Sequence, residues 1–441
     1  MKNDSIALIN PPAPFLIKER VFPNLGILNV ATDLKQHGYN IFVYDLSGIP
    51  NSSEQIRDIA KKHNYIGFSS TSPQFIETYK LFKDAKEENP QATYFIGGAH
   101  ASAVSSFRNR STLEQISMDP NVAPLEEFDI IFEGEGENIG EEIFKKGDKW
   151  RKSNLMRNIN DSPIPDRSFI DILSYEYLLK GEKTTTIMSQ RGCPYSCVFC
   201  CGRDIDMYRI ARSNSPERVL EELDYLNSEF GFKSFMWFDD EVNVNPKRLE
   251  KLSRLLQKKD YQHRGFVRSD LVLRFPDTVK QLKDAGFVEL CSGVESGSNE
   301  ILKKIKKQTT YEINLEAAHM IKNENITYKG FTIIGHPGET LKDIETTKKW
   351  IREADPDGFD ISILTPYPGS KIYDEAIPSS KFKGYEWENN GLYFNKVNYS
   401  KEESFYKGKP GEYHCHVRTD ELSASDLIKI RDSIEKDLKK S

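Results

Sequence analysis

Three cysteines carry the most distinctive chemistry in this 441-residue chain. Cys193, Cys197 and Cys200 lie in one short run, directly after an apolar, strand-like stretch. A cubane iron–sulfur cluster holds four irons, and clusters that only transfer electrons cap all four with thiolates. A loop with only three thiolates leaves one iron open, and a substrate can bind at an open metal position as a ligand. The spacing therefore predicts a [4Fe–4S] cluster with one reactive corner.

Other interpretations of the cysteines are weaker. A structural zinc site pairs two Cys-x2-Cys knuckles, and the six cysteines include no second knuckle. A disulfide framework does not suit a chain in which we expect no signal peptide and which has few cysteines per residue. We expect Cys201 to point away from the cluster and Cys291 to be a small buried apolar residue. His414 and His416 flank Cys415 and could bind a metal, but no partner ligands lie nearby, so a structural role is expected.

Composition excludes several classes of function. Hydrophobic residues make up 38% of the chain and charged residues 29%, and no apolar run is long enough to cross a bilayer. We therefore expect a cytoplasmic protein with no membrane span. The net charge is -6 and the pI is about 5.9, so the chain lacks the basic footprint that grips a phosphate backbone. Nucleic acid is not an expected partner.

Residues 1–145 alternate apolar strand runs with amphipathic helical runs, which predicts a doubly wound parallel sheet. The strands are expected at 5–10, 40–45, 65–69, 93–96 and 130–132. Every strand ends in a polar or glycine-rich turn, and ligands of such sheets lie over the carboxyl ends of the strands. The residues expected to line this crevice are Asn10, Asp45, Gly48, Ser69, Ser70, Gly97, Gly98, Glu133 and Gly134. The only histidine in these turns, His100, is expected to be a hydrogen-bonded loop residue.

Residues 146–183 are expected to form a linker. Their prolines, at 163 and 165, cannot continue a helix or pair inside a sheet. We expect Tyr175, Tyr177 and Leu178 to pack this linker onto the second domain.

Residues 184–375 repeat a strand–helix period six times. Strands are expected at 184–189, 234–238, 265–267, 288–294, 328–334 and 359–364. Helices are expected at 216–229, 246–258, 276–285, 298–305, 311–323 and 341–354. Six such units form a partial parallel barrel whose active site lies at the carboxyl ends of the strands. Residues 376–441 should then cap the open barrel, shape the substrate pocket and end in a helix over 423–440.

The run from Arg191 to Cys200 resembles the loop of the radical S-adenosylmethionine (SAM) superfamily. The turns of the first half resemble those of the cobalamin-binding domain that precedes many of its members. This resemblance implies an α/β fold with an N-terminal Rossmann-like cobalamin-binding domain, a partial (β/α)6 TIM barrel and a small C-terminal α+β cap. It also implies three cofactors: a [4Fe–4S] cluster, SAM bound at the open iron, and cobalamin. An external electron donor such as flavodoxin or ferredoxin would reduce the cluster, and SAM would be cleaved to a 5'-deoxyadenosyl radical.

The resemblance also assigns residues to the SAM site. Asp239 and Asp240 end the second strand, where the family holds the methionine ammonium. Arg268 and Ser269 end the third strand and suit the methionine carboxylate. Glu295 ends the fourth strand and matches the family position that accepts both ribose hydroxyls.

The remaining assignments lie nearer the adenine and the substrate. Phe199 in the cysteine loop can cover an adenine face. Residues 335–340 resemble the adenine-side turn of the family, in which His336 replaces a more usual apolar residue and could donate a proton to substrate. Tyr367 lies in a turn over 365–370 that resembles the cobalamin-linked branch, and it is a second catalytic candidate.

Structural roles stay open for several of these residues. Arg268 and Asp270 could pair with each other as surface charges, and residues 239–241 could cap the following helix. Lys306 and Lys307 lie near a basic position of the family, but they could also be a solvated helix end.

The predicted function is a radical SAM enzyme, most simply a cobalamin-dependent methyltransferase that acts on an unactivated carbon of a metabolite or natural product. One alternative is a radical dehydratase, cyclase or epimerase that does not use its first domain for methyl transfer. A further alternative is a non-catalytic iron–sulfur redox sensor or electron carrier. In either enzymatic case the expected substrate is a small molecule.

Overall fold

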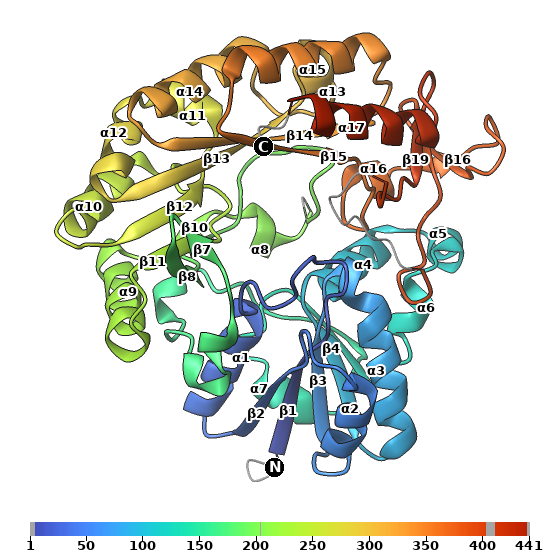
Figure 1. The fold of residues 1–441 in the computed structure, drawn as a ribbon. Helices are drawn as coiled ribbons and strands as arrows, with labels where there is room; N and C mark the ends of the chain where they lie inside the picture. The colour runs from blue at the N-terminus through green and yellow to red at the C-terminus, as the bar shows by residue number, and fades with distance from the viewer. Residues whose placement is uncertain (1–4, 203, 403–410, 439–441) are drawn as a thin grey trace. The chain divides into compact units, whose positions relative to one another are not determined.

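The computed structural model describes residues 5–202, 204–402 and 411–438, which form two compact units. The first unit contains the described residues up to Tyr177 together with 204–209 and 396–402. The second contains the rest of the described residues (Figure 1). No helix among the described residues combines the length and the apolar character that a bilayer span needs.

The first unit is built on a parallel sheet with the strand order β2-β1-β3-β4-β5-β6. Its strands are β1 (Ser5–Asn10), β2 (Asn40–Asp45), β3 (Tyr65–Ser69), β4 (Thr93–Gly97), β5 (Ile130–Glu133) and β6 (Trp150–Lys152). All pairs in this sheet are parallel. The strand order reverses between β1 and β3, which is where such sheets bind ligands. The predicted doubly wound sheet is confirmed.

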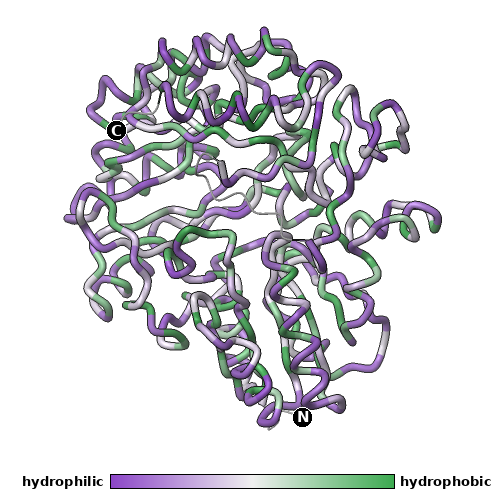
Figure 2. Tube along the Cα trace, turned by 45° about the vertical axis from the view of Figure 1, so that its right-hand side comes forward, coloured by the Kyte–Doolittle hydropathy of each residue, from purple (hydrophilic) through white to green (hydrophobic). Residues whose placement is uncertain are grey.

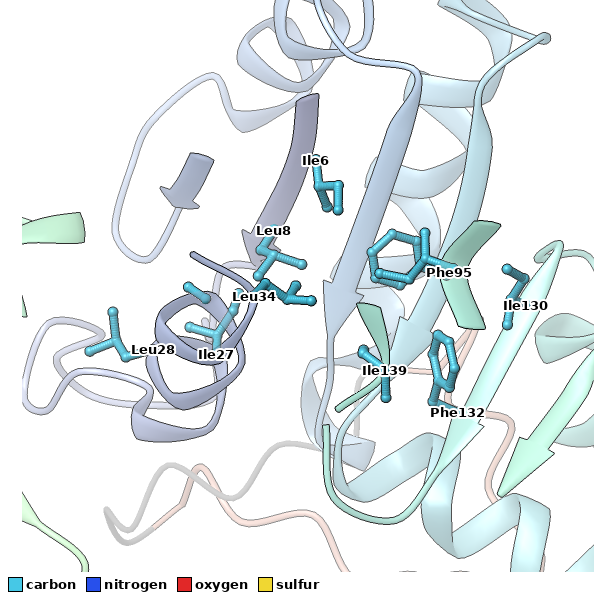
Figure 3. Close-up of a cluster of buried hydrophobic side chains, with 11 residues drawn as sticks. Ile6, Leu8, Ile27, Leu28, Leu34, Phe95, Ile130, Phe132 and Ile139 are labelled. Carbon is cyan, nitrogen blue, oxygen red and sulfur yellow. The ribbon is translucent and has the colours of Figure 1, made fainter. Parts of the chain in front are cut away.

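Helices cover both faces of this sheet. They are α1 (Leu25–Gln36), α2 (Ser52–Ala60), α3 (Phe75–Glu88), α4 (Ala99–Arg110), α5 (Leu113–Met118), α6 (Val122–Leu125) and α7 (Gly140–Phe144). Figure 3 shows the core beneath α1, where buried side chains of that helix meet side chains of β1, β4 and β5. On the opposite face, the Phe82 ring of α3 lies 5.5 Å from the Tyr94 ring of β4, centroid to centroid. Because both faces are covered, the inner strands β1, β3, β4 and β5 are mostly buried rather than alternating between buried and exposed positions.

The segment expected to be a linker belongs largely to the first unit. Residues 150–152 form β6 at the edge of the sheet. The Tyr175 hydroxyl donates to the Asp45 carboxylate, and the Tyr177 ring lies 4.7 Å from that of Phe22. The prediction that these two tyrosines pack onto the second domain is therefore wrong. A buried tyrosine packs where its hydroxyl finds a polar partner, and the partner of Tyr175, Asp45, is distant in sequence.

The second unit is built on a seven-stranded sheet with the order β15-β14-β13-β12-β11-β8-β7. The strands are β7 (Leu178–Leu179), β8 (Glu182–Ile187), β11 (Ser234–Trp237), β12 (Gln262–Phe266), β13 (Phe287–Glu295), β14 (Thr327–Ile334) and β15 (Gly358–Ile363). All pairs are parallel except β7 with β8. The sheet is open, with β15 and β7 at its edges, which confirms the predicted partial barrel. Leu178 thus joins this sheet as expected.

The helices of this unit follow the strands. They are α9 (Pro216–Phe230), α10 (Pro246–Leu256), α11 (Ser269–Arg274), α12 (Asp277–Asp284), α13 (Asn299–Lys304), α14 (Tyr311–Asn323), α15 (Leu341–Ala354) and α16 (Lys371–Asp374). The short helix α8 (Asp206–Arg209) belongs to the first unit. Ser215 caps α9 by accepting from the Arg218 amide, and Pro216 starts the helix. Figure 2 shows hydrophilic and hydrophobic stretches alternating along the helices, as expected where one face is buried.

The C-terminal region combines an antiparallel sheet with a helix. The strands are β16 (Ile377–Pro378), β17 (Trp387–Asn389), β18 (Leu392–Phe394) and β19 (Val417–Thr419), followed by α17 (Ala424–Leu438). The expected end of this helix at residue 440 lies outside the described residues. Arg431 donates from Nε to the Ile361 carbonyl (3.2 Å), and the Ile363 amide donates to the Tyr413 hydroxyl (2.8 Å). The C-terminal region thus covers the free edge of β15, as predicted for a cap on the barrel.

One part of this region packs elsewhere. Residues 396–402 lie within the first unit. Lys396 pairs with Asp119 at 3.4 Å, and the two side chains are only 3% and 1% exposed. The Asn121 side chain accepts from the Tyr399 amide (3.1 Å). The expectation that the whole tail caps the barrel is corrected here, because these buried polar groups find their partners in the first unit.

Replacing Lys396 with methionine is expected to destabilise the first unit by about 3 kcal/mol, because it leaves the Asp119 carboxylate buried without its cation. For a unit of this size the melting temperature should fall by roughly 6–12 °C. Thermal unfolding of the cofactor-free protein measures the shift. Lys401→Met, at an exposed position of the same segment, is the matched control and should melt like the wild type. Equal melting of both variants would contradict the assigned role of the ion pair.

Candidate functional site

The cysteine loop follows the first strand of the barrel. After β8 the chain forms a short strand, β9 (Gln190–Arg191), which pairs antiparallel with β10 (Arg212–Ser213). The loop containing Cys193, Cys197 and Cys200 lies between these two strands. All three cysteines are free thiols, Cys197 is buried, and the other two are half-buried. The pairing of β9 with β10 therefore joins the two ends of the segment that contains the cysteine loop.

The middle of this loop is anchored on two sides. The Val198 amide donates to the Ile305 carbonyl at the end of α13 (3.0 Å), and the Val198 carbonyl accepts from the Ile372 amide at the start of α16 (3.2 Å). The loop backbone is therefore fixed from both directions, although it has no regular secondary structure of its own.

The donor set fits a cluster better than a single metal ion. Within the described ranges, no three His, Cys, Asp or Glu side chains gather closely enough to hold one metal ion. A cubane takes one thiolate on each of three irons, so three cysteines in one loop fit a cluster whose fourth iron is open. Cys291 is fully buried, and burial raises the pKa of its thiol to about 11, in line with the structural role expected for it.

Asp239 and Asp240 hold the strand that leads into the cysteine loop. Asp239 accepts from the Ser189 amide (2.6 Å), the Ser189 hydroxyl (2.5 Å) and the Gln190 amide (3.0 Å). Burial raises the pKa of Asp239 to about 6. Asp240 accepts from the Gly192 amide (2.8 Å). Both carboxylates fix the backbone just before Cys193, and their expected contact with the methionine ammonium stays a prediction.

Glu241 is the acidic residue of this run that remains available. Its carboxylate is half-buried and makes no hydrogen bond or ion pair to any of the described residues. Burial raises the pKa of Glu241 to about 8, although Lys307 and Arg268 lower it. Sequence reasoning placed Glu241 at the strand end but did not select it. Glu241 is the third carboxylate in the run 239–241, and the spacing alone did not show which of the three is available to a ligand.

The end of β12 contributes one engaged and one unengaged group. The Arg268 guanidinium donates from Nε to Asp270 (2.8 Å) and from Nη2 to the Lys307 carbonyl (2.7 Å). The predicted pairing of Arg268 with Asp270 is present, but Arg268 is buried rather than on the surface. The Ser269 hydroxyl is buried and has no hydrogen-bond partner among the described residues. Ser269 therefore offers a free donor where a carboxylate ligand is expected.

Glu295 ends β13 in a strained conformation, with φ +64°. Its Oε1 accepts from Nζ of Lys307 at 2.8 Å, and both side chains are buried. A Cβ on Gly293 would lie 2.2 Å from this carboxylate oxygen, so only glycine leaves room for the pair. Lys306 and Gln308 also have positive φ, +55° and +59°. Left-handed backbone thus occurs at Glu295 and at both neighbours of Lys307. Because Lys307 is buried, it is not the solvated helix end considered above.

Two cations face the cysteine loop. Burial lowers the pKa of Lys307, but Glu295 and the Cys197 thiol outweigh it and raise the pKa above its usual range. Burial also acts against the charge of Arg268, and Asp270 with Glu241 raises its pKa in spite of that.

Phe199 and His336 lie together behind the loop. Phe199 packs against Ile301, Leu302 and Ile305 of the α13 region, and its ring meets that of His336 edge-on at 5.9 Å. His336 is fully buried, its ring nitrogens make no hydrogen bond of normal geometry to the described residues, and burial lowers its pKa to about 4. The imidazole is therefore neutral and sealed from substrate in this conformation.

Tyr367 lies after β15 and is half-buried, with its carbonyl accepting from the Ser370 hydroxyl (2.7 Å). The catalytic roles of His336 and Tyr367 stay predictions.

In the first unit, the residues expected to bind cobalamin do gather at the carboxyl ends of the strands, but many bind one another. Asn10 donates to Asp45 (2.8 Å) and to the Ser47 hydroxyl (2.8 Å). The Gly48 amide donates to Glu19 (2.9 Å). These bonds join the loops after β1 and β2 and leave Gly48 exposed.

The turns after β3 and β4 pack against each other. The buried Ser70 hydroxyl bonds with that of Thr78 (2.9 Å). Gly98 has φ +90°, and a Cβ there would lie 2.9 Å from both the amide nitrogen and the carbonyl oxygen of Ser70. Ser69 and Gly97 remain half-exposed at the strand ends. The glycine at 98 is therefore explained by turn packing, whether or not a ligand lies above it.

The last crevice turn is also internally bonded. Glu133 is buried and accepts from the Ser105 hydroxyl (2.8 Å), and Gly134 has φ +102°.

His100 is buried, bonds through Nδ1 with the Ser72 hydroxyl (3.0 Å), and burial lowers its pKa to about 3. The donor set of these turns thus fits a cofactor held by packing and neutral hydrogen bonds rather than by a histidine–metal bond. The cobalamin-binding roles of individual residues stay predictions.

Comparison with known families matches both units. Residues 187–351 match the model described as the radical SAM superfamily, and residues 19–115 match the model described as a B12 binding domain. A Pyrococcus horikoshii protein named as an uncharacterized methyltransferase is 28% identical over 413 residues, covering 88% of this chain and 86% of that protein. An anaerobic magnesium-protoporphyrin IX monomethyl ester cyclase of Rubrivivax gelatinosus is 24% identical over 382 residues, covering 80% of this chain and 66% of its own length.

A solved structure shares the fold over almost the whole chain. The radical SAM methyltransferase TsrM from Kitasatospora setae, solved with cobalamin and a [4Fe–4S] cluster, superposes with a TM-score of 0.66. The match covers 99% of this chain and 92% of that one at 15% sequence identity. The two family matches confirm the expected enzyme class and its cofactor set of [4Fe–4S] cluster, SAM and cobalamin. The chain thus combines a B12-binding domain, matched over residues 19–115, with a radical SAM domain, matched over residues 187–351.

Proposed function

We propose that this protein is a cobalamin-dependent methyltransferase that acts on an unactivated carbon of a small molecule. The observation that carries the proposal is the three-thiol loop flanked by the buried Glu295–Lys307 pair, in a chain that also has a B12-binding domain. The names of the Pyrococcus relative and of TsrM support methyl transfer. Small-molecule substrates and an external reductant such as flavodoxin or ferredoxin are part of the same proposal.

The chain's own residues divide the work of binding SAM. Glu241 would accept from the methionine amino group, Ser269 would donate to the methionine carboxylate, and Glu295 would accept from the ribose hydroxyls through its second oxygen. Cys193, Cys197 and Cys200 would hold the cluster. When bound, the cluster supplies the electron that cleaves SAM, and cobalamin supplies the methyl group. The protein positions these groups and keeps water from them.

The test uses protein purified anaerobically from cobalamin-replete medium, with SAM and a strong reductant. Retained cobalt and the formation of both S-adenosylhomocysteine and 5'-deoxyadenosine are expected, because a methyl donor leaves the former and radical generation the latter. Retention of no cobalt while deoxyadenosine still forms would reject methyl transfer. If neither product forms, the result would instead favour the alternative of a non-catalytic iron–sulfur redox protein.

A radical cyclase, dehydratase or epimerase is the second candidate. The observation that favours it is the similarity to the Rubrivivax cyclase, which also covers most of this chain. This candidate predicts deoxyadenosine without S-adenosylhomocysteine in the same assay.

Replacing Glu241 with glutamine is expected to weaken SAM binding roughly tenfold, because a charge-assisted hydrogen bond becomes a neutral one. Equilibrium binding of SAM to the cluster-loaded protein measures the change. Glu229→Gln, on the exposed side of α9, is the control and should bind like the wild type. Unchanged affinity in the Glu241 variant would show that another group binds the methionine amino group of SAM.

A further inference from the structure

Arg268 is buried and holds protein partners along one edge of its guanidinium. The residue is 3% exposed, and its edge donates to Asp270 and to the Lys307 carbonyl. Asn243 brackets its backbone, donating to the Arg268 carbonyl (3.1 Å) and accepting from the Arg268 amide (3.1 Å). A guanidinium presents its donors in one plane, and these partners bind its Nε and Nη2.

The face of the same guanidinium is covered by the cysteine loop. The Tyr195 ring, between Cys193 and Cys197, lies 3.5 Å from the guanidinium carbon, centroid to atom. Such close stacking of a cation on an aromatic face is attractive, and it is stronger where both groups are shielded from water. Arg268 therefore touches the cluster loop through its face and the α13–α14 connection through its edge.

We propose that Arg268 is a positioning residue of the cysteine loop rather than a ligand of the methionine carboxylate. It links the Tyr195 ring to the Lys307 backbone, and the Lys307 side chain in turn holds Glu295. The links place the thiols and the ribose-binding carboxylate in one fixed frame. This inference rests on the proposed function, because it takes the cysteine loop as the holder of the cluster.

The test compares Arg268→Lys, Tyr195→Leu and Tyr195→Phe in the cluster-loaded full-length protein without SAM. Lysine keeps the charge but loses the planar fork, leucine loses the stack, and phenylalanine keeps it. The rate of iron loss to a chelator should rise about tenfold in Arg268→Lys and in Tyr195→Leu, and stay near wild type in Tyr195→Phe. The electron paramagnetic resonance spectrum of the reduced cluster should change in the same two variants. The double variant should lose iron no faster than the worse single one, since both changes break one contact.

Arg254→Lys, an exposed position of α10, is the matched control and should behave as wild type. The proposal is overturned if Arg268→Lys and Tyr195→Leu keep the wild-type iron-loss rate and spectrum while Arg268→Lys alone weakens SAM binding, since that pattern belongs to a direct ligand. Melting of the cofactor-free variants shows whether either change merely unfolds the protein; if Arg268→Lys does, Tyr195→Leu against Tyr195→Phe decides the matter. The readout needs neither SAM nor cobalamin, so a failure of methyl transfer leaves it intact and is recognised separately.

Discussion

Replacing any one of Cys193, Cys197 and Cys200 with alanine is expected to abolish the formation of 5'-deoxyadenosine. Three thiolates are the smallest set that leaves a cubane one open corner, and two leave it with two exposed irons. The backbone anchors at Val198 would keep the loop in place, so the loss would be chemical rather than a collapse of the fold. Iron content per chain and deoxyadenosine released under strong reductant measure the effect.

The remaining cysteines supply matched controls. Cys201→Ala removes the thiol next to Cys200, and Cys415→Ala removes one that donates to the Val417 carbonyl (3.2 Å). Both variants should form the cluster and cleave SAM at close to the wild-type level. If Cys201→Ala loses the cluster while Cys200→Ala keeps it, the third cluster ligand is Cys201 and not Cys200.

Much of the fold could be predicted because its strands are buried on both faces and read as apolar runs. Five strands of the first unit and five of the six parallel barrel strands appear near their expected positions, whereas β6 lies in the segment expected to be a linker. The exception is β12, which begins at Gln262 rather than near residue 265. Its first residues, Gln262, His263 and Arg264, are polar because His263 finds a partner in Trp237 (3.0 Å) and Arg264 pairs with Glu289 (2.8 Å). These partners lie on other strands, so the hydropathy of the sequence does not predict the pairings.

The candidate site was predictable where one short run supplies all its parts, and not where distant groups combine. The cysteine loop and Glu295 follow from local motifs. The division of labour among residues 239–241 does not, because it depends on which carboxylate meets the amides of Ser189 and Gly192. Lys307 is likewise visible only once Glu295 and Cys197 are placed beside it.

Breaking the Glu295–Lys307 pair is expected to have separate effects on stability and on chemistry. Lys307→Met leaves the Glu295 carboxylate buried without its cation, which should destabilise the second unit by about 3 kcal/mol. Removing the charge of the partner as well, in Glu295→Gln/Lys307→Met, should recover most of this loss, because neutral groups replacing a buried ion pair cost little. Unfolding of the cofactor-free protein measures both changes.

Activity should not recover with stability. Glu295→Gln is expected to lower deoxyadenosine formation by about a hundredfold or more, because a neutral amide accepts weaker hydrogen bonds from the ribose hydroxyls than a carboxylate does and SAM is then misplaced. The double variant should be as inactive as Glu295→Gln alone, although it melts close to wild type. A stable and active double variant would show that the pair serves folding only. Lys349→Met, which removes an exposed lysine of α15, is the control for loss of one positive charge. The contrast separates the two roles because stability depends on charge balance within the buried pair, whereas SAM binding depends on the carboxylate itself.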